Sequence, residues 1–372
     1  MKDDGPTERS NAEGVGVVIT GGGTGGHLTP MLALARELRD RGARIYLVGG
    51  DRGADRRMLG ASGFEHRLLR APAVERKRWW RNAPLPFALA AAVASGRRIL
   101  AERRPDVVAG TGGYASVPVV LAAALSGLPI LLQEQNRVPG LATRFLARWA
   151  DRVCVQFPET VAELEGRAPV EVTGSPIAPP TSAAPDFADR LDPGRPTVGV
   201  FGGSQGARAI NDALLAWLCE SPATAGFDLV WQTGPGDLER VVAAADWPEG
   251  FVIRPFFDEM GAVYPLLDLA VCRAGAMTIA EVTAWGVPSI LIPYPHATDD
   301  HQTANAKALA DAGAAIRLPE ADLSGRRLRN LVLGLVADRE RRDRMAEAAR
   351  ALGRPEAAAT VADRTLEMAE AR

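Results

Sequence analysis

The chain has 372 residues, 47% of them hydrophobic and 24% charged, an ordinary globular composition whose length favours two domains over one. Its formal net charge of −2 excludes a global basic field, so we expect no nucleic-acid partner. The three cysteines are widely separated and odd in number, which argues against a disulfide or zinc framework and indicates a reducing compartment. The first residues lack the apolar core of a secretory signal, and we expect no membrane span.

The first half of the chain alternates predicted strands with predicted helices. A β-branched strand at 16–20 runs into the glycine-rich segment 21–27, and apolar residues at helical spacing follow through residue 38. A second glycine-rich turn, 110–114, leads into a helix at 117–125. This order predicts a parallel, doubly wound α/β domain. The remaining strands of this half are expected at 45–48, 107–109, 129–132, 153–156 and 170–173.

Gly21, Gly23 and Gly26 match the G-x-G-x-x-G pattern of dinucleotide-binding loops. That reading also needs an acid at the end of the second strand, and Asp51 comes too late for it. We therefore expect no nicotinamide cofactor, and no other cofactor.

A proline-rich linker follows the first half, and then the opening theme recurs. A strand at 197–201, a glycine loop at 202–208 and a helix at 210–218 repeat the strand, loop and helix of residues 16–38. The fold class is thus predicted as α/β, with two Rossmann-like domains facing across a cleft. Further strands are expected at 229–232, 252–254, 269–272 and 289–292, and the tail 331–371 reads as helical.

The segment 269–295 is the most informative of the second half. It reads as a strand, a tight turn, a helix beginning at Met277, and another strand. A helix that starts directly after a strand suits a phosphate, and Glu281, one turn in, could accept both hydroxyls of a ribose. The alternative is that Thr278 and Glu281 form only a capping box. The sequence leaves both readings open.

Six motifs occur in one order along the chain: GGGTGGH, GGY, EQN, GGSQGAR, CRAGAMTIAE and DDHQTANA. Together they resemble the bacterial MurG family over residues 17–315. The resemblance implies the two-domain GT-B glycosyltransferase fold. It also implies an inverting transfer of N-acetylglucosamine from UDP-N-acetylglucosamine (UDP-GlcNAc) to the C4 hydroxyl of the muramyl sugar of undecaprenyl-diphospho-MurNAc-pentapeptide (lipid I). The products would be lipid II, a peptidoglycan precursor, and UDP.

The resemblance also implies a division into domains: 1–178 for acceptor binding and membrane docking, 179–355 for UDP-GlcNAc, and a helix from about 356 to 372 packing back on the first. One position departs from the family pattern, because Ala178 stands where relatives usually carry arginine. The donor-binding residues implied are Thr24, Gly25, Gly26, Asn136, Ser204, Phe257, Ala276, Met277, Thr278, Ile279, Ala280, Glu281 and Gln302, and the acceptor-binding residues are Gly112, Gly113 and Tyr114.

Transfer to a sugar hydroxyl needs a base, stabilisation of the leaving UDP and positioning. His27, at the start of a helix, is the candidate base, because the helix N-terminus disfavours the imidazolium. Its alternatives are a role in orienting the acceptor or only in closing the loop. A metal is not required, since helix and glycine-loop N–H groups can stabilise the diphosphate. His296, Asp299, Asp300 and His301 form a metal-like cluster by composition, which we interpret as a polar loop beside the donor sugar.

An aromatic and basic segment predicts docking on an anionic membrane surface. Its alternative is a helix packed into its own domain. With a polyprenyl-linked acceptor, the resemblance implies a peripheral protein on the cytoplasmic face of the membrane. The docking residues predicted are Arg76, Lys77, Arg78, Trp79, Trp80, Arg81 and Phe87.

Two other functions are open. A UDP-N-acetylglucosamine 2-epimerase shares the architecture but acts on a soluble substrate, and so gives the tryptophan pair no purpose. A non-catalytic scaffold would bind UDP-GlcNAc without turnover.

Overall fold

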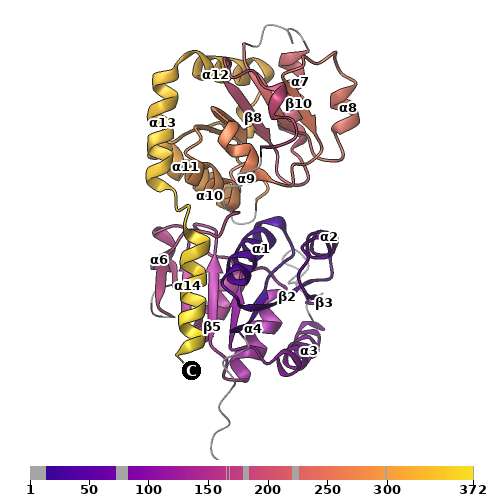
Figure 1. The fold of residues 1–372 in the computed structure, drawn as a ribbon, viewed down its shortest axis with the longest axis vertical. Helices are drawn as coiled ribbons and strands as arrows, with labels where there is room; N and C mark the ends of the chain where they lie inside the picture. The colour runs from indigo at the N-terminus through magenta and orange to yellow at the C-terminus, as the bar shows by residue number, and fades with distance from the viewer. Residues whose placement is uncertain are drawn as a thin grey trace, which may run out of the picture.

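The structure is a computed structural model that describes residues 14–72, 83–164, 166, 168–178, 184–219, 226–297 and 300–371. Figure 1 shows two lobes stacked along the long axis, one built from the first half of the chain and the other from the second. Each lobe is a parallel sheet with helices on both faces. The predicted fold class is confirmed.

The first lobe is organised around a parallel sheet whose seven described strands run in the order β3-β2-β1-β4-β5-β6-β7. The central strand β1 pairs on both sides, with Ile19 opposite Leu47 and Ala109. Val17 and Ile19 face one helical layer and Val18 the other, as the two-residue period of a strand requires. The strands are β1 (Gly16–Thr20), β2 (Arg44–Gly50), β3 (His66–Leu69), β4 (Val107–Gly110), β5 (Ile130–Glu134), β6 (Arg152–Val155) and β7 (Val170–Val172).

Helices cover both faces of this sheet and bury its apolar residues. Leu28, Leu34 and Leu38 of the first helix are fully buried against one face. The helices are α1 (Gly25–Asp40), α2 (Gly53–Ala61), α3 (Leu85–Arg103), α4 (Ser116–Leu125), α5 (Leu141–Leu146) and α6 (Glu159–Leu164), with a 3-10 turn η2 (Ala147–Trp149) after α5.

The second lobe repeats the design with six described strands in the order β10-β9-β8-β11-β12-β13. Again a glycine loop follows the central strand. The strands are β8 (Thr197–Phe201), β9 (Asp228–Gln232), β10 (Phe251–Arg254), β11 (Leu269–Cys272), β12 (Ser289–Leu291) and β13 (Ala315–Arg317). The α-helices, with the 3-10 turn η5 that precedes β11, are α7 (Arg208–Leu218), α8 (Leu238–Val242), α9 (Met260–Val263), η5 (Tyr264–Leu266), α10 (Ala276–Trp285), α11 (His301–Asp311), α12 (Gly325–Ala337) and α13 (Arg339–Leu352).

The last helix, α14 (Ala357–Glu370), returns to the first lobe, where Figure 1 shows it beside the first sheet. Val361 and Ala362 are fully buried in the core that α1 shares with β1. Arg364 donates to both carboxylate oxygens of Glu171 on β7 at 2.9–3.1 Å. Among the described residues, no helix combines the length and apolar character that crossing a membrane would need.

Candidate functional site

The first glycine loop, between β1 and α1, is held by a buried carboxylate. Asp55 accepts hydrogen bonds from the backbone N–H groups of Gly23, at 3.1 Å, and Gly50, at 2.8 Å. At Gly22, where φ is +140°, a Cβ would lie 2.0 Å from Asp55 Oδ1. Only glycine therefore allows the loop to approach this carboxylate. Thr24, Gly25 and Gly26 follow at its open side, where Thr24 and Gly26 are exposed.

The second glycine turn packs directly on the first, with His27 between them. A Cβ on Gly113 would lie 2.0 Å from the Gly22 carbonyl, and one on Gly112 would lie 2.9 Å from His27 Nδ1. His27 Nδ1 lies 3.1 Å from the carbonyl oxygen of Thr111. Because a carbonyl oxygen only accepts, Nδ1 carries the proton, and a neutral ring then has its lone pair on Nε2. The half-buried imidazole thus has a basic nitrogen.

Tyr114 ends the second turn, and its hydroxyl is turned inward. The oxygen is buried without a hydrogen-bond partner in the described part of the chain. A Cβ on Gly50 would lie 2.8 Å from it, and the Arg52 guanidinium stands 4.5 Å from the ring centroid. Burial raises the pKa of Tyr114, so the phenol stays protonated at neutral pH. Its ring therefore supports the glycine loops, whereas its hydroxyl does not open onto solvent.

In the second lobe, α10 begins directly after β11. Gly275 is the N-cap, in extended conformation and without a side-chain cap, so N–H groups of the first turn, which holds Ala276, Met277 and Thr278, point out of the helix. The capping-box alternative is wrong: Thr278 is the third residue inside the helix, and Glu281 binds elsewhere. Ile279 and Ala280 are buried and anchor the helix in the core and against Ile177.

Glu281 lies one turn inside α10 and receives a hydrogen bond from the Tyr264 hydroxyl, 2.8 Å from Oε2. The side chain keeps some exposed surface, yet the carboxyl lies deep enough that burial raises its pKa to about 7. The hydrogen bond from Tyr264 acts in the opposite direction, because it stabilises the carboxylate. Tyr264 thus fixes Oε2 of Glu281, and among the described residues no side chain or backbone group donates to Oε1.

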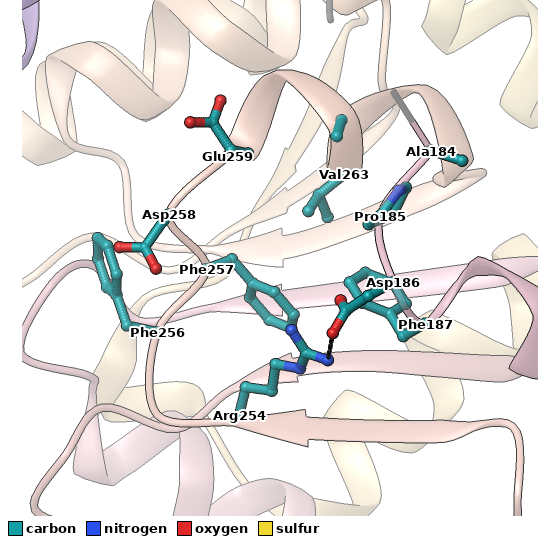
Figure 2. A pocket seen from close by; sticks show the side chains of 11 residues that line it. Ala184, Pro185, Asp186, Phe187, Arg254, Phe256, Phe257, Asp258, Glu259 and Val263 are labelled. Atoms are coloured by element: carbon teal, nitrogen blue, oxygen red, sulfur yellow. Dashed lines mark hydrogen bonds and ion pairs between the residues drawn. The ribbon is translucent and has the colours of Figure 1, made fainter. Parts of the chain in front are cut away.

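Phe257 is almost fully buried, and its backbone N–H donates to Gln232 Oε1 at 3.0 Å. Gln232 Nε2 in turn donates to the carbonyl of Gly203 in the second-lobe glycine loop, also at 3.0 Å. Figure 2 shows the Phe257 ring beside Arg254, which pairs with Asp186 at 2.8 Å, in a cavity of about 280 Å³. Phe257 therefore lines this cavity with a packed ring, and its backbone N–H is engaged by Gln232.

Asn136 and Gln302 are each held by one end of their amides. Asn136 donates from its backbone N and its Nδ2 to Glu134 Oε1, at 3.0 and 3.1 Å. Gln302, in the first turn of α11, accepts from the backbone N–H of Tyr294 at 2.9 Å. Both side chains are half-buried. Asn136 Oδ1 and Gln302 Nε2 are the atoms through which each could meet a sugar.

The two lobes meet where these elements begin. Figure 1 shows α1 and α10 on facing sides of the junction, and the two helices are in contact. A Cβ on Gly25 would lie 3.8 Å from Ser204 Oγ, so the glycine loops of both lobes are neighbours. Gln156 Nε2 of the first lobe donates to the carbonyl of Ala276 at 3.3 Å. The predicted loops at 24–27 and 204, and the α10 start, are thus brought together.

Of the predicted docking residues, the structure describes Phe87 alone. Arg76, Lys77, Arg78, Trp79, Trp80 and Arg81 fall outside the described residues, and Phe87 stands at the start of α3 with 82% of its surface exposed. Asp299 also lies outside them. In the part of the chain that the structure describes, no three His, Cys, Asp or Glu side chains gather as a metal site.

Sequence reasoning missed three polar residues that support the site: Asp55, Gln232 and Tyr264. Each acts on a partner between 17 and 32 residues away, so no local spacing signals it.

Two parallel α/β lobes that bring a glycine loop of each, a helix N-terminus and a recessed carboxylate to one junction define a GT-B glycosyltransferase. The family 28 N-terminal glycosyltransferase domain matches residues 17–155, and the family 28 C-terminal domain matches residues 197–361.

Similar proteins show which family of GT-B glycosyltransferases the chain resembles. A protein of Chlorobium phaeobacteroides, named UDP-N-acetylglucosamine–N-acetylmuramyl-(pentapeptide) pyrophosphoryl-undecaprenol N-acetylglucosamine transferase, is 40% identical over 95% of this chain and 99% of its own. The crystal structure of Acinetobacter baumannii MurG, 32% identical, superposes with a TM-score of 0.73 over 95% of this chain and 99% of that one. The chain belongs to this MurG family of N-acetylglucosamine transferases.

A UDP-N-acetylglucosamine 2-epimerase from Listeria monocytogenes is also similar, with a TM-score of 0.68 over 94% of each chain. At 15% identity this likeness concerns the fold alone.

Proposed function

We propose that this protein transfers N-acetylglucosamine from UDP-GlcNAc, with inversion, to the C4 hydroxyl of the muramyl sugar of lipid I, giving lipid II and UDP for peptidoglycan synthesis. The observation that carries the proposal is the junction itself. The open start of α10 and Glu281 stand on one side of it, and the His27 imidazole stands on the other. A nucleotide-sugar bound by the start of α10 and Glu281 would present its sugar to the His27 imidazole.

The donor half of the site is proposed as follows. The diphosphate binds at the first turn of α10, where free N–H groups and the helix dipole stabilise negative charge, and at Ser204 of the glycine loop. The ribose hydroxyls donate to Glu281, and the uracil lies beside the backbone of Phe257. Asn136 binds the sugar through Oδ1 and Gln302 through Nε2, the amide atoms that their hydrogen bonds to Glu134 and Tyr294 do not use. As UDP departs, its growing charge meets the same N–H groups, so no metal is needed.

On the acceptor side, His27 is proposed to take the proton from the C4 hydroxyl. Its Nδ1–H is bound to Thr111, which leaves Nε2 as the basic atom. Thr111 is itself held, because its carbonyl also accepts from Gln135 Nε2 at 2.9 Å and its hydroxyl donates to the carbonyl of His27 at 2.9 Å. A fixed ring serves equally to orient the acceptor.

Residues 1–178, together with α14, are proposed as the acceptor domain, and 179–355 as the donor domain. Gly112, Gly113 and Tyr114 remain the proposed acceptor contacts, through backbone atoms and the tyrosine ring. Ala178 cannot supply the charge of the arginine that relatives usually carry there, so the donor site is proposed to work without that contact.

The test offers the purified protein UDP-GlcNAc labelled in the sugar, with a short-chain analogue of lipid I. We expect label in the lipid product, and the product should carry a β-linkage. Conversion of UDP-GlcNAc to its 2-epimer without an acceptor would identify an epimerase. Binding of UDP-GlcNAc with no product of either kind would identify a scaffold, and either result would refute the proposal.

We also propose that the first lobe docks on the anionic cytoplasmic face of the membrane. In addition to Phe87, several large apolar side chains of this lobe are exposed. The exposed fraction is 67% for Leu125, 39% for Trp149 and 38% for Phe145. Val93, Leu121, Leu125 and Trp149 border an apolar hollow of about 200 Å³ between α3, α4 and η2. The Arg148 guanidinium stands 5.1–5.2 Å from the Phe145 and Trp149 ring centroids. Apolar side chains with cations beside them suit a headgroup region.

Docking is tested on vesicles of neutral and anionic lipid at rising salt. Each basic residue near an anionic surface contributes about 1 kcal/mol, and salt screens it, so binding should require anionic lipid and weaken with salt. Replacing Trp79, Trp80 and Phe87 by alanine should reduce vesicle binding and transfer to a long-chain acceptor, yet spare a short, soluble acceptor. Leu352→Ala, an exposed apolar residue of the second lobe, is the matched control. Equal loss with both acceptors would show that the two tryptophans belong to the core.

A further inference from the structure

Tyr264 is a buried polar side chain for which the proposed chemistry has no role yet. It lies in η5, directly before β11, and only 2% of its surface is exposed. Its ring packs 5.9 Å from the ring of Phe201, at the end of the central strand β8. A buried phenol hydroxyl needs a partner, and here the partner is Glu281 Oε2, at 2.8 Å.

We propose that Tyr264 is a positioning residue for the donor nucleotide: its hydroxyl fixes one oxygen of Glu281 and keeps this carboxylate an acceptor for the ribose hydroxyls. The inference rests on the proposed function, in which Glu281 binds the ribose. The geometry supports it because Tyr264 comes from η5 and Glu281 from α10, so the hydrogen bond fixes the carboxylate from outside its own helix. With Oε2 held, rotation of the carboxylate is limited, and Oε1 keeps one direction.

The charge state of Glu281 gives this contact a measurable consequence. Burial raises the pKa of Glu281 to about 7, and the hydrogen bond from Tyr264 lowers it. Burial also raises the pKa of Tyr264 well above its usual value, so the phenol remains a donor at neutral pH. A neutral carboxyl offers a weaker acceptor to two hydroxyls than a carboxylate does. UDP affinity should therefore rise as the pH rises through about 7.

Other titratable groups around α10 do not explain such a dependence. Cys272 of β11 faces Glu281, and burial raises its pKa to about 12, so it stays neutral. From α13, Arg350 contacts Gly286 at the far end of α10. From α11, the neutral Asn305 side chain donates to the carbonyl of Ala274 at 3.1 Å. From α1, which also contacts α10, His27 lies in the first turn, and a His27 variant is therefore included in the experiment.

The experiment measures the affinity of Tyr264→Phe for UDP by calorimetry between pH 5.5 and 8.5. A probe without both ribose hydroxyls, 2′,3′-dideoxy-UDP, reports the rest of the site. We expect the pH midpoint of the variant to rise by about one unit, so that it binds UDP about fivefold more weakly at pH 7, and up to about tenfold more weakly below both midpoints, since one pKa unit corresponds to a factor of ten. At pH 8.5 its affinity should approach that of the wild type. Its affinity for 2′,3′-dideoxy-UDP should not change. His27→Asn should keep the wild-type pH midpoint.

Tyr46→Phe is the matched control, because Tyr46 is a buried tyrosine of the first lobe, in β2. An unchanged affinity and midpoint in Tyr264→Phe would overturn the inference. So would an equal loss for both nucleotides at every pH, which would mean that the hydroxyl only supports packing. If the variant does not fold, 3-fluorotyrosine at position 264 supplies a stronger donor and should lower the midpoint, and an unmoved midpoint would again overturn it. Failure of wild-type protein to bind UDP would instead refute the proposed donor site.

Discussion

Replacing Glu281 with glutamine should change stability and nucleotide binding in opposite directions. The pKa of Glu281 is raised to about 7 in the folded protein, against 4.5 for an exposed glutamate. A raised carboxyl pKa means that the folded state binds the proton more tightly, so the free energy of unfolding is highest below pH 4.5 and falls as the pH rises through 7. A difference of about 2.5 units at 1.36 kcal/mol each gives a ceiling of about 3 kcal/mol.

Because part of the Glu281 side chain meets solvent, we expect about 1–3 kcal/mol of this effect. Glu281→Gln cannot ionise but can still accept from Tyr264. At pH 8 the variant should therefore be more stable than the wild type by that amount, whereas at pH 4 the two should agree. Its affinity for UDP should fall by about 1.5–3 kcal/mol, the range for hydrogen bonds to a charged group.

Urea unfolding at pH 4 and pH 8, together with calorimetric titration of UDP, checks both parts. The wild type should lose stability between these values more steeply than the variant. A variant less stable at pH 8, with UDP affinity intact, would refute the reasoning. It would mean that the carboxylate is a structural acceptor that α10 needs and the ribose does not.

Two further predictions concern the first lobe. His27→Ala should reduce turnover by about a hundredfold or more if Nε2 is the base, with UDP affinity nearly unchanged, in a transfer assay paired with calorimetry; parallel loss of both would indicate a collapsed glycine loop. Arg364→Met should destabilise the protein by about 1 kcal/mol at pH 7, because hydrogen bonds from Arg364 hold the pKa of Glu171 below its usual value. That contribution exists above the unfolded pKa of Glu171 and disappears as the pH falls through the folded value, so variant and wild type should converge near pH 3 in urea unfolding. A difference independent of pH would assign the effect to packing.

Much of the fold is determined by local sequence. The predicted strands 16–20, 197–201 and 269–272 have the bounds of β1, β8 and β11, because buried parallel strands are short apolar runs, and glycine ends the first two of them. The short strands β3 and β13 were not predicted. HRLL and AIR carry no apolar run, and they become strands because β2 and β12 offer them an edge to pair with. Helices α2 and α11 were missed for a similar reason, since their apolar stripes are weak.

The functional site likewise has features that local sequence determines and features that only the tertiary structure determines. The glycine loops, the start of α10 and the position of Glu281 within it follow from neighbouring residues. The contacts that give these groups their chemistry come from distant ones: Thr111 fixes the proton of His27 across 84 residues, and Tyr264 reaches Glu281 across 17. Sequence spacing could not choose between the capping box and the ribose acceptor, because both place Glu281 on the same helical face. Only the folded chain, by burying Tyr264 next to the carboxylate, decided how that carboxylate is held and how readily it ionises.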